Sequence, residues 1–177
     1  MTAPHEIWGQ VADRWSEVYA QIRDGQWDSP TPCEGWTVRD LVDHLQWHVT
    51  ALRMLGADTQ PGGGWEDIRS DLDALLSDPS RLEGNVNDFG GMPRSALAAF
   101  LVGDRLIHTW DLARSIGVDE TLPPDAVAAT MEGLQHVPVE LLRGRNPLGL
   151  DMMGDAVAVP DDVTDQDRML AYTGRRP

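Results

Sequence analysis

Apolar residues recur at helical spacing along most of this chain. Near the N-terminus, Ile7, Val11, Trp15 and Val18 fall on one helical face, and similar stripes follow further along. The spacing predicts helices over residues 7–22, 37–55, 65–76, 93–116, 124–134 and 166–172. The pattern therefore predicts an all-α protein with four longer helices and a few short ones.

Loop and cap signals separate these stripes. Thr37 precedes the second helix as an N-cap, with Asp40 three residues on as an acidic form of the capping box, and Gly117 ends the fourth helix. Glycine, proline and polar residues fill 56–64, 77–92 and 144–163. Within the last stretch, residues 156–159 are a candidate for a short extended segment. Because the connections are long, we expect an antiparallel four-helix bundle with crossover loops, in one domain over residues 1–177.

Two of the apolar stripes are interrupted by histidines and acids. Asp104 and His108 are four residues apart and so share a helical face that is otherwise apolar. His44 and His48 lie beside or within the stripe of the second helix. Because a buried polar group is costly without a partner, these side chains require an explanation.

A divalent metal site is the sharpest explanation. His44, Asp104 and His108 form a set of two imidazoles and one carboxylate, which suits zinc, nickel or non-haem iron(II). The alternative is a core histidine, with His108 hydrogen-bonded to Asp104 or to a backbone carbonyl. The spacing Asp-x-x-x-His alone leaves both readings open.

Several neighbours have two readings each. His48 is either a residue at the rim of the site or a hydrogen-bond donor to a ligand. Asp111 either orients the His108 ring by a hydrogen bond or lies at the surface. Asp40 has the same two possible roles with respect to His44. Cys33, in the loop before the second helix, is expected to be a small buried hydrophobe rather than a nucleophile. The tryptophans expected to line a pocket near the ligands are Trp36, Trp47 and Trp110.

Composition narrows the classes of function. The 29 acidic residues outnumber the 14 basic ones, for a net charge of −15, which argues against nucleic acid and acidic membranes as partners. All basic residues are arginines, so Schiff-base chemistry is excluded, and Arg39, Arg53 or Arg105 would have to hold an anionic substrate. The single cysteine rules out an internal disulfide. Without a signal peptide or an apolar span, a cytoplasmic location is expected.

Two separated segments carry a family resemblance. The stretch TPCEGWTVRDLVDHL at 31–45 resembles the second-helix signature of the mycothiol-dependent maleylpyruvate isomerase N-terminal domain, and DRLIHTWDLA at 104–113 resembles its second ligand segment. The tail over 167–177 resembles an actinobacterial subfamily of this DinB-like group. The resemblance implies a DinB-like four-helix bundle with a divalent metal, usually zinc, held by His44, Asp104 and His108. It also implies a low-molecular-weight thiol such as mycothiol, as an isomerase cofactor or in S-transfer.

The resemblance has two departures. Asp104 stands where the isomerase has a glutamate, and the C-terminal domain of the isomerase has no counterpart in this sequence. Both count against maleylpyruvate isomerisation itself. Three hypotheses follow: a metal- and thiol-dependent transferase or isomerase acting on an electrophilic small molecule, a non-catalytic metal-binding bundle, or an interaction protein that has lost the site. The catalytic residues, the electrophile and a homodimeric state stay open.

Overall fold

The helices and their connections follow the predicted order. The computed structural model describes residues 2–87, 91–144 and 153–177. Its helices are α1 (Pro4–Tyr19), η1 (Asp24–Gln26), α2 (Val38–Asp43), α3 (Leu45–Met54), α4 (Trp65–Leu76), η2 (Pro79–Leu82), α5 (Arg94–Ile116), α6 (Pro124–Gln135), α7 (Val139–Leu142) and α8 (Asp165–Tyr172). Two short antiparallel strands, β1 (Asn85–Val86) and β2 (Met92–Pro93), pair within the connection between α4 and α5.

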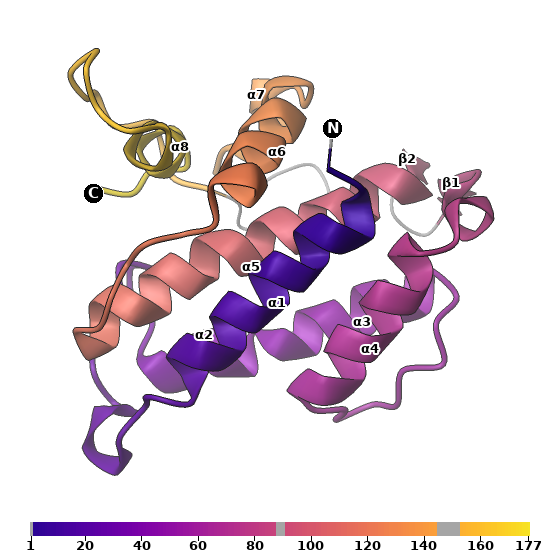
Figure 1. Ribbon diagram of the computed structural model, residues 1–177, viewed down its shortest axis with the longest axis horizontal. Coiled ribbons are helices and arrows are strands. Elements are labelled where there is room, and N and C mark those ends of the chain that lie inside the picture. The colour runs from indigo at the N-terminus through magenta and orange to yellow at the C-terminus, as the bar shows by residue number, and fades with distance from the viewer. Residues whose placement is uncertain (1, 88–90, 145–152) are drawn as a thin grey trace.

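The main bundle consists of α1, α3, α4 and α5 (Figure 1). Helix α1 packs against α4 and α5, and α3 packs against the same two helices. Arg14, near the end of α1, donates to the carbonyl of Thr121, just beyond the end of α5, at 2.9 Å, so these two helices run in one direction. Arg94 at the start of α5 donates to the Leu55 carbonyl after α3, so α3 runs the opposite way. The predicted DinB-like bundle with crossover loops is confirmed.

Tryptophans tie α4 to α1. The indole N–H of Trp65 donates to Ser16 Oγ at 2.8 Å, and that of Trp8 donates to the Arg69 carbonyl at 3.0 Å. The Trp65 ring lies 5.9 Å from the Trp15 ring and 5.8 Å from the Trp8 ring, centroid to centroid. Each such pair contributes roughly 0.5–1.5 kcal/mol beyond its buried area. These contacts hold the side of the bundle formed by α1 and α4.

Helix α5 is the central helix, covered by α1, α3 and α6. Buried positions run almost without a break along its middle and later turns, so polar side chains there are buried together with apolar ones. Gly103 allows the close approach of α6, since a Cβ at this position would lie 3.1 Å from Thr130 Cγ2. The burial of His108 and Asp111, and the small exposure of Asp104, therefore follow from the central place of their helix.

The second predicted helix is interrupted at His44. The prediction of one continuous helix over 37–55 is wrong, because α2 ends at Asp43 and α3 begins at Leu45. His44 keeps a helical φ of −58° with a ψ of −18°, and the Trp47 N–H bonds back to the His44 carbonyl at 3.0 Å. Such an i to i+3 turn is tighter than an α-helix, and tight turns within helices often mark functional sites.

The loops differ from expectation in smaller ways. Residues 77–92 contain η2 and a strand pair as well as loop. Residues 156–159 form no strand, although the Val157 N–H donates to the Ala171 carbonyl at 2.9 Å. Residues 145–152 of the predicted Gly- and Pro-rich stretch lie outside the described residues. The last helix is confirmed, with the Thr164 side chain as its N-cap.

We expect Thr37→Ala to destabilise the start of α2. The Thr37 side chain accepts a bond from the Asp40 N–H, and the Asp40 carboxylate accepts from the Thr37 N–H at 2.8 Å. Loss of an N-cap of this kind costs about 1 kcal/mol of unfolding free energy. Urea denaturation measures the loss, and Thr37→Ser, which keeps the hydroxyl, should restore most of it. Equal stability of Thr37→Ala and the unchanged protein would contradict this reading of the cap.

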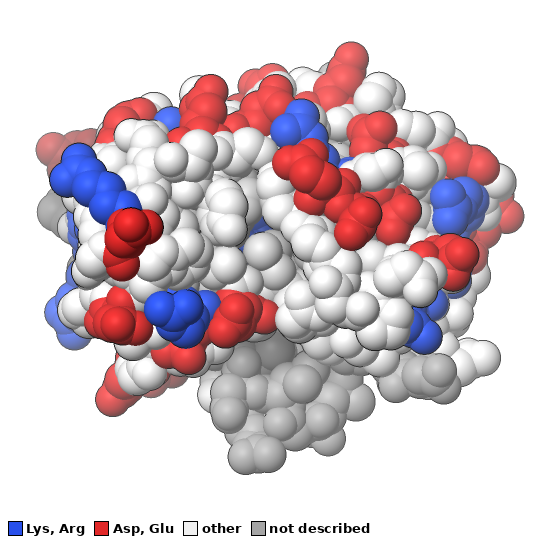
Figure 2. Space-filling model, turned by 90° about the horizontal axis from the view of Figure 1, so that it is seen from below, with Lys and Arg blue, Asp and Glu red and all other residues white. Residues whose placement is uncertain are grey.

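The surface reflects the acidic composition. On the face drawn in Figure 2, acidic side chains with fewer basic ones lie mainly toward the edges, and uncharged surface occupies much of the middle. The coloured residues of this face form no continuous basic patch. Over the parts of the chain that the structure describes, no helix is long and apolar enough to cross a membrane.

Candidate metal centre

The three predicted ligands come together between α3 and α5. His44 lies at the α2–α3 junction, and Asp104 and His108 lie one turn apart on α5. Nε2 of His44 is 3.6 Å from one Asp104 oxygen, and Nε2 of His108 is 3.4 Å from the other. One potential ligand atom from each residue lies within 4.8 Å of the other two. The three residues are therefore close enough, and of the right types, to hold one metal ion.

The second ring nitrogen of His108, Nδ1, contacts a buried carboxylate. Its Nδ1 lies 2.9 Å from Oδ2 of Asp111, whose side chain has no exposed surface. Arg175, in the C-terminal tail, donates to both oxygens of Asp111 at 2.8 and 3.2 Å. Asp111 is therefore a buried partner of the ring and not a surface acid. A carboxylate in this position fixes the orientation of an imidazole and directs Nε2 toward Asp104.

Cys33 lies on the Nδ1 side of the same ring. Its Sγ is 3.9 Å from His108 Nδ1, 3.4 Å from the Asp111 carboxylate and 3.6 Å from Nη2 of Arg175. The expectation of a buried hydrophobe is wrong, since these neighbours are polar and the residue is half-buried. Cys33, His108 and Asp111 form a second group with ligand atoms close enough for a metal. In this second group, however, the positively charged guanidinium of Arg175 already contacts the Asp111 carboxylate and the Cys33 sulfur, where a metal ion would bind.

His48 is a buried partner of Asp104. Its Nε2 lies 2.7 Å from Oδ2 of Asp104, and its side chain has no exposed surface. The rim reading of His48 is thus wrong, and its position fits the reading of a donor to Asp104. Burial lowers the pKa of His48 to about 4, with the charge of Arg105 acting in the same direction and the contact with Asp104 opposing it. His48 is therefore neutral near pH 7.

Both acids on α5 have a lowered pKa, although Asp111 is fully buried and the Asp104 side chain is only 14% exposed. Burial raises the pKa of Asp104, but the hydrogen bonds and charge of the surrounding histidines lower it well below its usual range. For Asp111, His108 and Arg175 outweigh burial and lower the pKa to about 2. Burial lowers the pKa of His108, yet the two carboxylates raise it well above its usual value. Without a metal, His108 is thus an imidazolium between two carboxylates.

Trp36 covers the ligand histidines. Its ring centroid lies 5.0 Å from that of His44 and 5.8 Å from that of His108. The prediction that Trp110 lines the pocket is wrong, because Trp110 is 1% exposed and stacks on Arg114 at 4.3 Å. Trp47 is partly buried against the core. The site reaches solvent at His44, whose side chain is 24% exposed.

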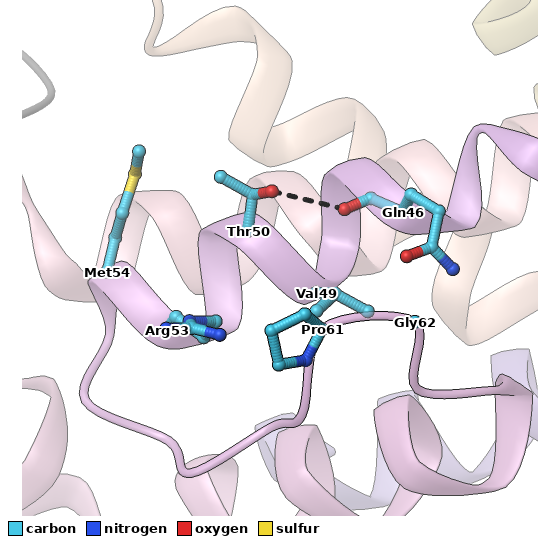
Figure 3. A pocket seen from close by; sticks show the side chains of 7 residues that line it. All are labelled: Gln46, Val49, Thr50, Arg53, Met54, Pro61 and Gly62. Carbon is cyan, nitrogen blue, oxygen red and sulfur yellow. Dashed lines mark hydrogen bonds between the residues drawn. The ribbon is translucent and has the colours of Figure 1, made fainter.

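The predicted arginines do not gather at the site. Arg105 is fully buried, and Arg39 is exposed, with Nη2 3.7 Å from Asp28. Arg53 lies on another flank of α3, in a pocket of about 480 Å³ that also has Met54 and Pro61 in its wall (Figure 3). Asp40 closes the capping box with the Thr37 N–H. Among the described arginines, Arg175 instead bonds to Asp111, the partner of His108. No spacing indicates this contact, because Arg175 is 64 residues from Asp111.

Comparisons with known proteins place the chain in a family. Uncharacterized protein Rv0738 of Mycobacterium tuberculosis strain H37Rv is 20% identical over 175 residues, covering 94% of both chains. Uncharacterized protein Rv0036c of the same strain is 27% identical over 140 residues, covering 60% of this chain and 54% of that protein. No solved structure matches. The model of the mycothiol maleylpyruvate isomerase N-terminal domain matches residues 8–101, more than half of the chain and including His44. The chain belongs to the mycothiol maleylpyruvate isomerase N-terminal domain family.

Proposed function

We propose that this protein binds a divalent metal, zinc first, through His44, Asp104 and His108 and uses it to activate a low-molecular-weight thiol. The observation that carries the proposal is the convergence of two imidazole nitrogens and one carboxylate oxygen within 4.8 Å. Zinc, nickel and iron(II) all accept such a donor set.

The surroundings of the donor set support a site that can also accept a small molecule. Three protein ligands leave coordination positions free, as in catalytic rather than structural zinc sites. The partial exposure of His44 gives a path from solvent, and Trp36 forms an apolar wall beside it. Asp111 and His48 hold the ligands from the protein side at 2.9 and 2.7 Å.

Membership of a mycothiol-related family supports a thiol as the second component. A divalent metal held here would lower the pKa of the thiol and present the thiolate as a nucleophile. His44, Asp104 and His108 would keep the thiolate sulfur near Trp36, where an electrophilic substrate could approach. S-transfer or isomerisation would follow.

The second candidate function is a metal-binding bundle without catalysis. It is supported by the position of the three donors, which would let a metal ion link α3 to α5.

The experiment that separates these functions is a titration of the cobalt(II)-loaded protein with mycothiol. We expect a sulfur-to-cobalt charge-transfer band and the release of one proton per site. Cys33→Ser is the matched control, because it removes the chain's own thiol and should leave the band in place. Cobalt binding without a band would favour the non-catalytic bundle. A protein that binds neither metal nor mycothiol would overturn the proposal.

Zinc affinity is expected to rise with pH. In the metal-free protein the pKa of His108 is raised well above 6.5 by Asp104 and Asp111, against the effect of burial. A metal needs the neutral imidazole, so binding displaces one proton as long as the pH is below that pKa. The apparent affinity should therefore increase about tenfold per pH unit between pH 6 and 7. Competition titrations with a chromophoric chelator measure this slope, and equal affinities at the two pH values would contradict it.

A further inference from the structure

A pocket on the outer flank of α3 contains none of the proposed metal ligands. Its volume is about 480 Å³, which lies within the range of small-molecule sites. Helix α3 forms one wall, and the loop that leads from α3 to α4 forms the other (Figure 3). The residues that line the pocket are Gln46, Val49, Thr50, Arg53 and Met54 of α3 and Pro61 and Gly62 of the loop.

The pocket and the metal centre lie on opposite sides of α3. At about 3.6 residues per turn, the pocket residues Gln46, Thr50 and Arg53 fall on one side of the helix. His48, which contacts Asp104, falls on the other side. A molecule bound in the pocket would therefore be separated from the metal centre by the helix itself.

Hydrogen bonds hold the loop wall of the pocket in place. The Ala57 N–H donates to the Leu52 carbonyl at 3.0 Å, and the Thr59 hydroxyl donates to the Asp71 carboxylate of α4 at 2.5 Å. Gly62, in the wall itself, has a φ of 79°, which glycine adopts without strain. The wall is thus formed before a ligand arrives, which lowers the entropy cost of binding.

Arg53 is the charged residue of the lining, and its guanidinium is unpaired. Among the residues that the structure describes, none forms a hydrogen bond or an ion pair with this side chain. Arg14, Arg69 and Arg114, in contrast, each contact a carboxylate. The chain has 29 acidic residues and 14 basic ones, so most of its surface repels anions. An unpaired arginine in a pocket wall is available to an anion from solution.

The rest of the lining suits a ligand that is partly apolar. Val49, Met54 and Pro61 provide aliphatic side chains, and Val49 is 3% exposed. The Gln46 amide adds a polar group beside them, with Nε2 in a long hydrogen bond of 3.4 Å to the Gly63 carbonyl. Binding sites of small molecules commonly combine apolar walls with a few polar groups that fix the orientation of the ligand.

We propose that this pocket binds a small monocarboxylic acid with an aliphatic body. The Arg53 guanidinium holds the carboxylate through two parallel N–H donors, a geometry that arginine favours. Val49, Met54 and Pro61 cover the aliphatic body. The single charge of Arg53 matches that of a carboxylate, whereas a phosphate dianion would stay half-neutralised and a cation would be repelled. The inference does not depend on the proposed function.

The first test is a calorimetric titration of the protein with hexanoate, and with hexanamide as a neutral probe of nearly the same shape. We expect saturable binding of hexanoate and at least about tenfold weaker binding of hexanamide, because hydrogen bonds to charged groups are the stronger ones. In ¹H–¹⁵N spectra the amide resonance of Gly62 should shift with the same dissociation constant. No saturable binding of hexanoate, or equal affinity for the two probes, would overturn the proposal.

The second test removes the charge of the pocket. Arg53→Gln should weaken hexanoate binding at least about tenfold and change hexanamide binding by less than about twofold. Arg39→Gln is the matched control, since it removes the same charge from another side chain, 56% exposed, on α2. It should change hexanoate affinity by less than about twofold, because salt screens distant surface charges. Equal losses in the two variants would assign the effect to overall charge and overturn the proposal.

His108→Ala separates this pocket from the metal centre, because a carboxylate can also bind to a metal ion. The variant lacks a proposed metal ligand but keeps the pocket, so its affinity for hexanoate should equal that of the unchanged protein. Loss of hexanoate binding in His108→Ala, with retention in Arg53→Gln, would place the carboxylate on the metal and overturn the inference. If the unchanged protein binds no zinc, the proposed function fails while the hexanoate titrations still decide whether the pocket binds a carboxylate.

Discussion

His108→Ala is expected to abolish stoichiometric zinc binding while the helices persist. The substitution removes one of two imidazole ligands, and Asp104 and His44 alone leave a bidentate set. Since losing a mere partner of a ligand costs about 10–100-fold in metal affinity, losing the ligand should cost well over about 100-fold. Metal analysis after dialysis against zinc measures the occupancy, and circular dichroism checks that the helices remain.

His136→Ala is the matched control for this substitution. His136 caps the C-terminal end of α6 and belongs to neither group of potential ligands. Its zinc occupancy should equal that of the unchanged protein. Full occupancy in His108→Ala would contradict the assignment of His108 as a ligand.

Asp111→Ala is expected to lower both stability and zinc affinity. The carboxylate is fully buried and bonded to His108 and to Arg175, so its removal leaves the Arg175 guanidinium, 12% exposed, without its main partner. Breaking a buried ion pair from one side costs about 3–5 kcal/mol of unfolding free energy, and the small exposure of Arg175 points to the lower end. Urea denaturation of the metal-free protein measures this loss. Zinc affinity should fall about 10–100-fold, because the His108 ring loses its orienting partner.

The double variant Asp111→Ala with Arg175→Ala tests the origin of the loss. Without the guanidinium no unpaired charge is left, so the double variant should be more stable than the two single losses added together predict. Strictly additive losses would contradict the pairing of Asp111 with Arg175.

Much of the fold could be predicted from the apolar spacing. The stripe from Ile7 to Val18 and the run ended by Gly117 each gave a helix, because burial on one face sets a period that the sequence displays directly. The pairing of Asp104 with His108 was equally accessible, since residues four apart share a face of one helix. His44 was the best candidate for a third ligand from a facing helix, and the family resemblance implied the same residue. Spacing within one helix says nothing about a facing helix, so the distance between them could not be predicted.

Other features of the site could not be predicted, for physical reasons. Arg175 reaches Asp111 across 64 residues, and only the packing of the tail brings them together. The helix break at His44 carries no sequence signal such as proline or glycine. Neither residue is needed there, because His44 keeps a right-handed helical backbone conformation. Cys33 was misjudged because its polar neighbours come from α5 and the tail, not from its own loop.

The most direct test of the central claim is X-ray absorption at the zinc edge of the reconstituted protein in thiol-free buffer. If His44, Asp104 and His108 hold the ion, the spectrum should show two imidazoles and further oxygen ligands at about 2.0–2.2 Å, with no sulfur. A sulfur at about 2.3 Å would place the metal at Cys33, His108 and Asp111 and contradict the assignment. Protein without zinc after reconstitution would contradict a metal centre altogether.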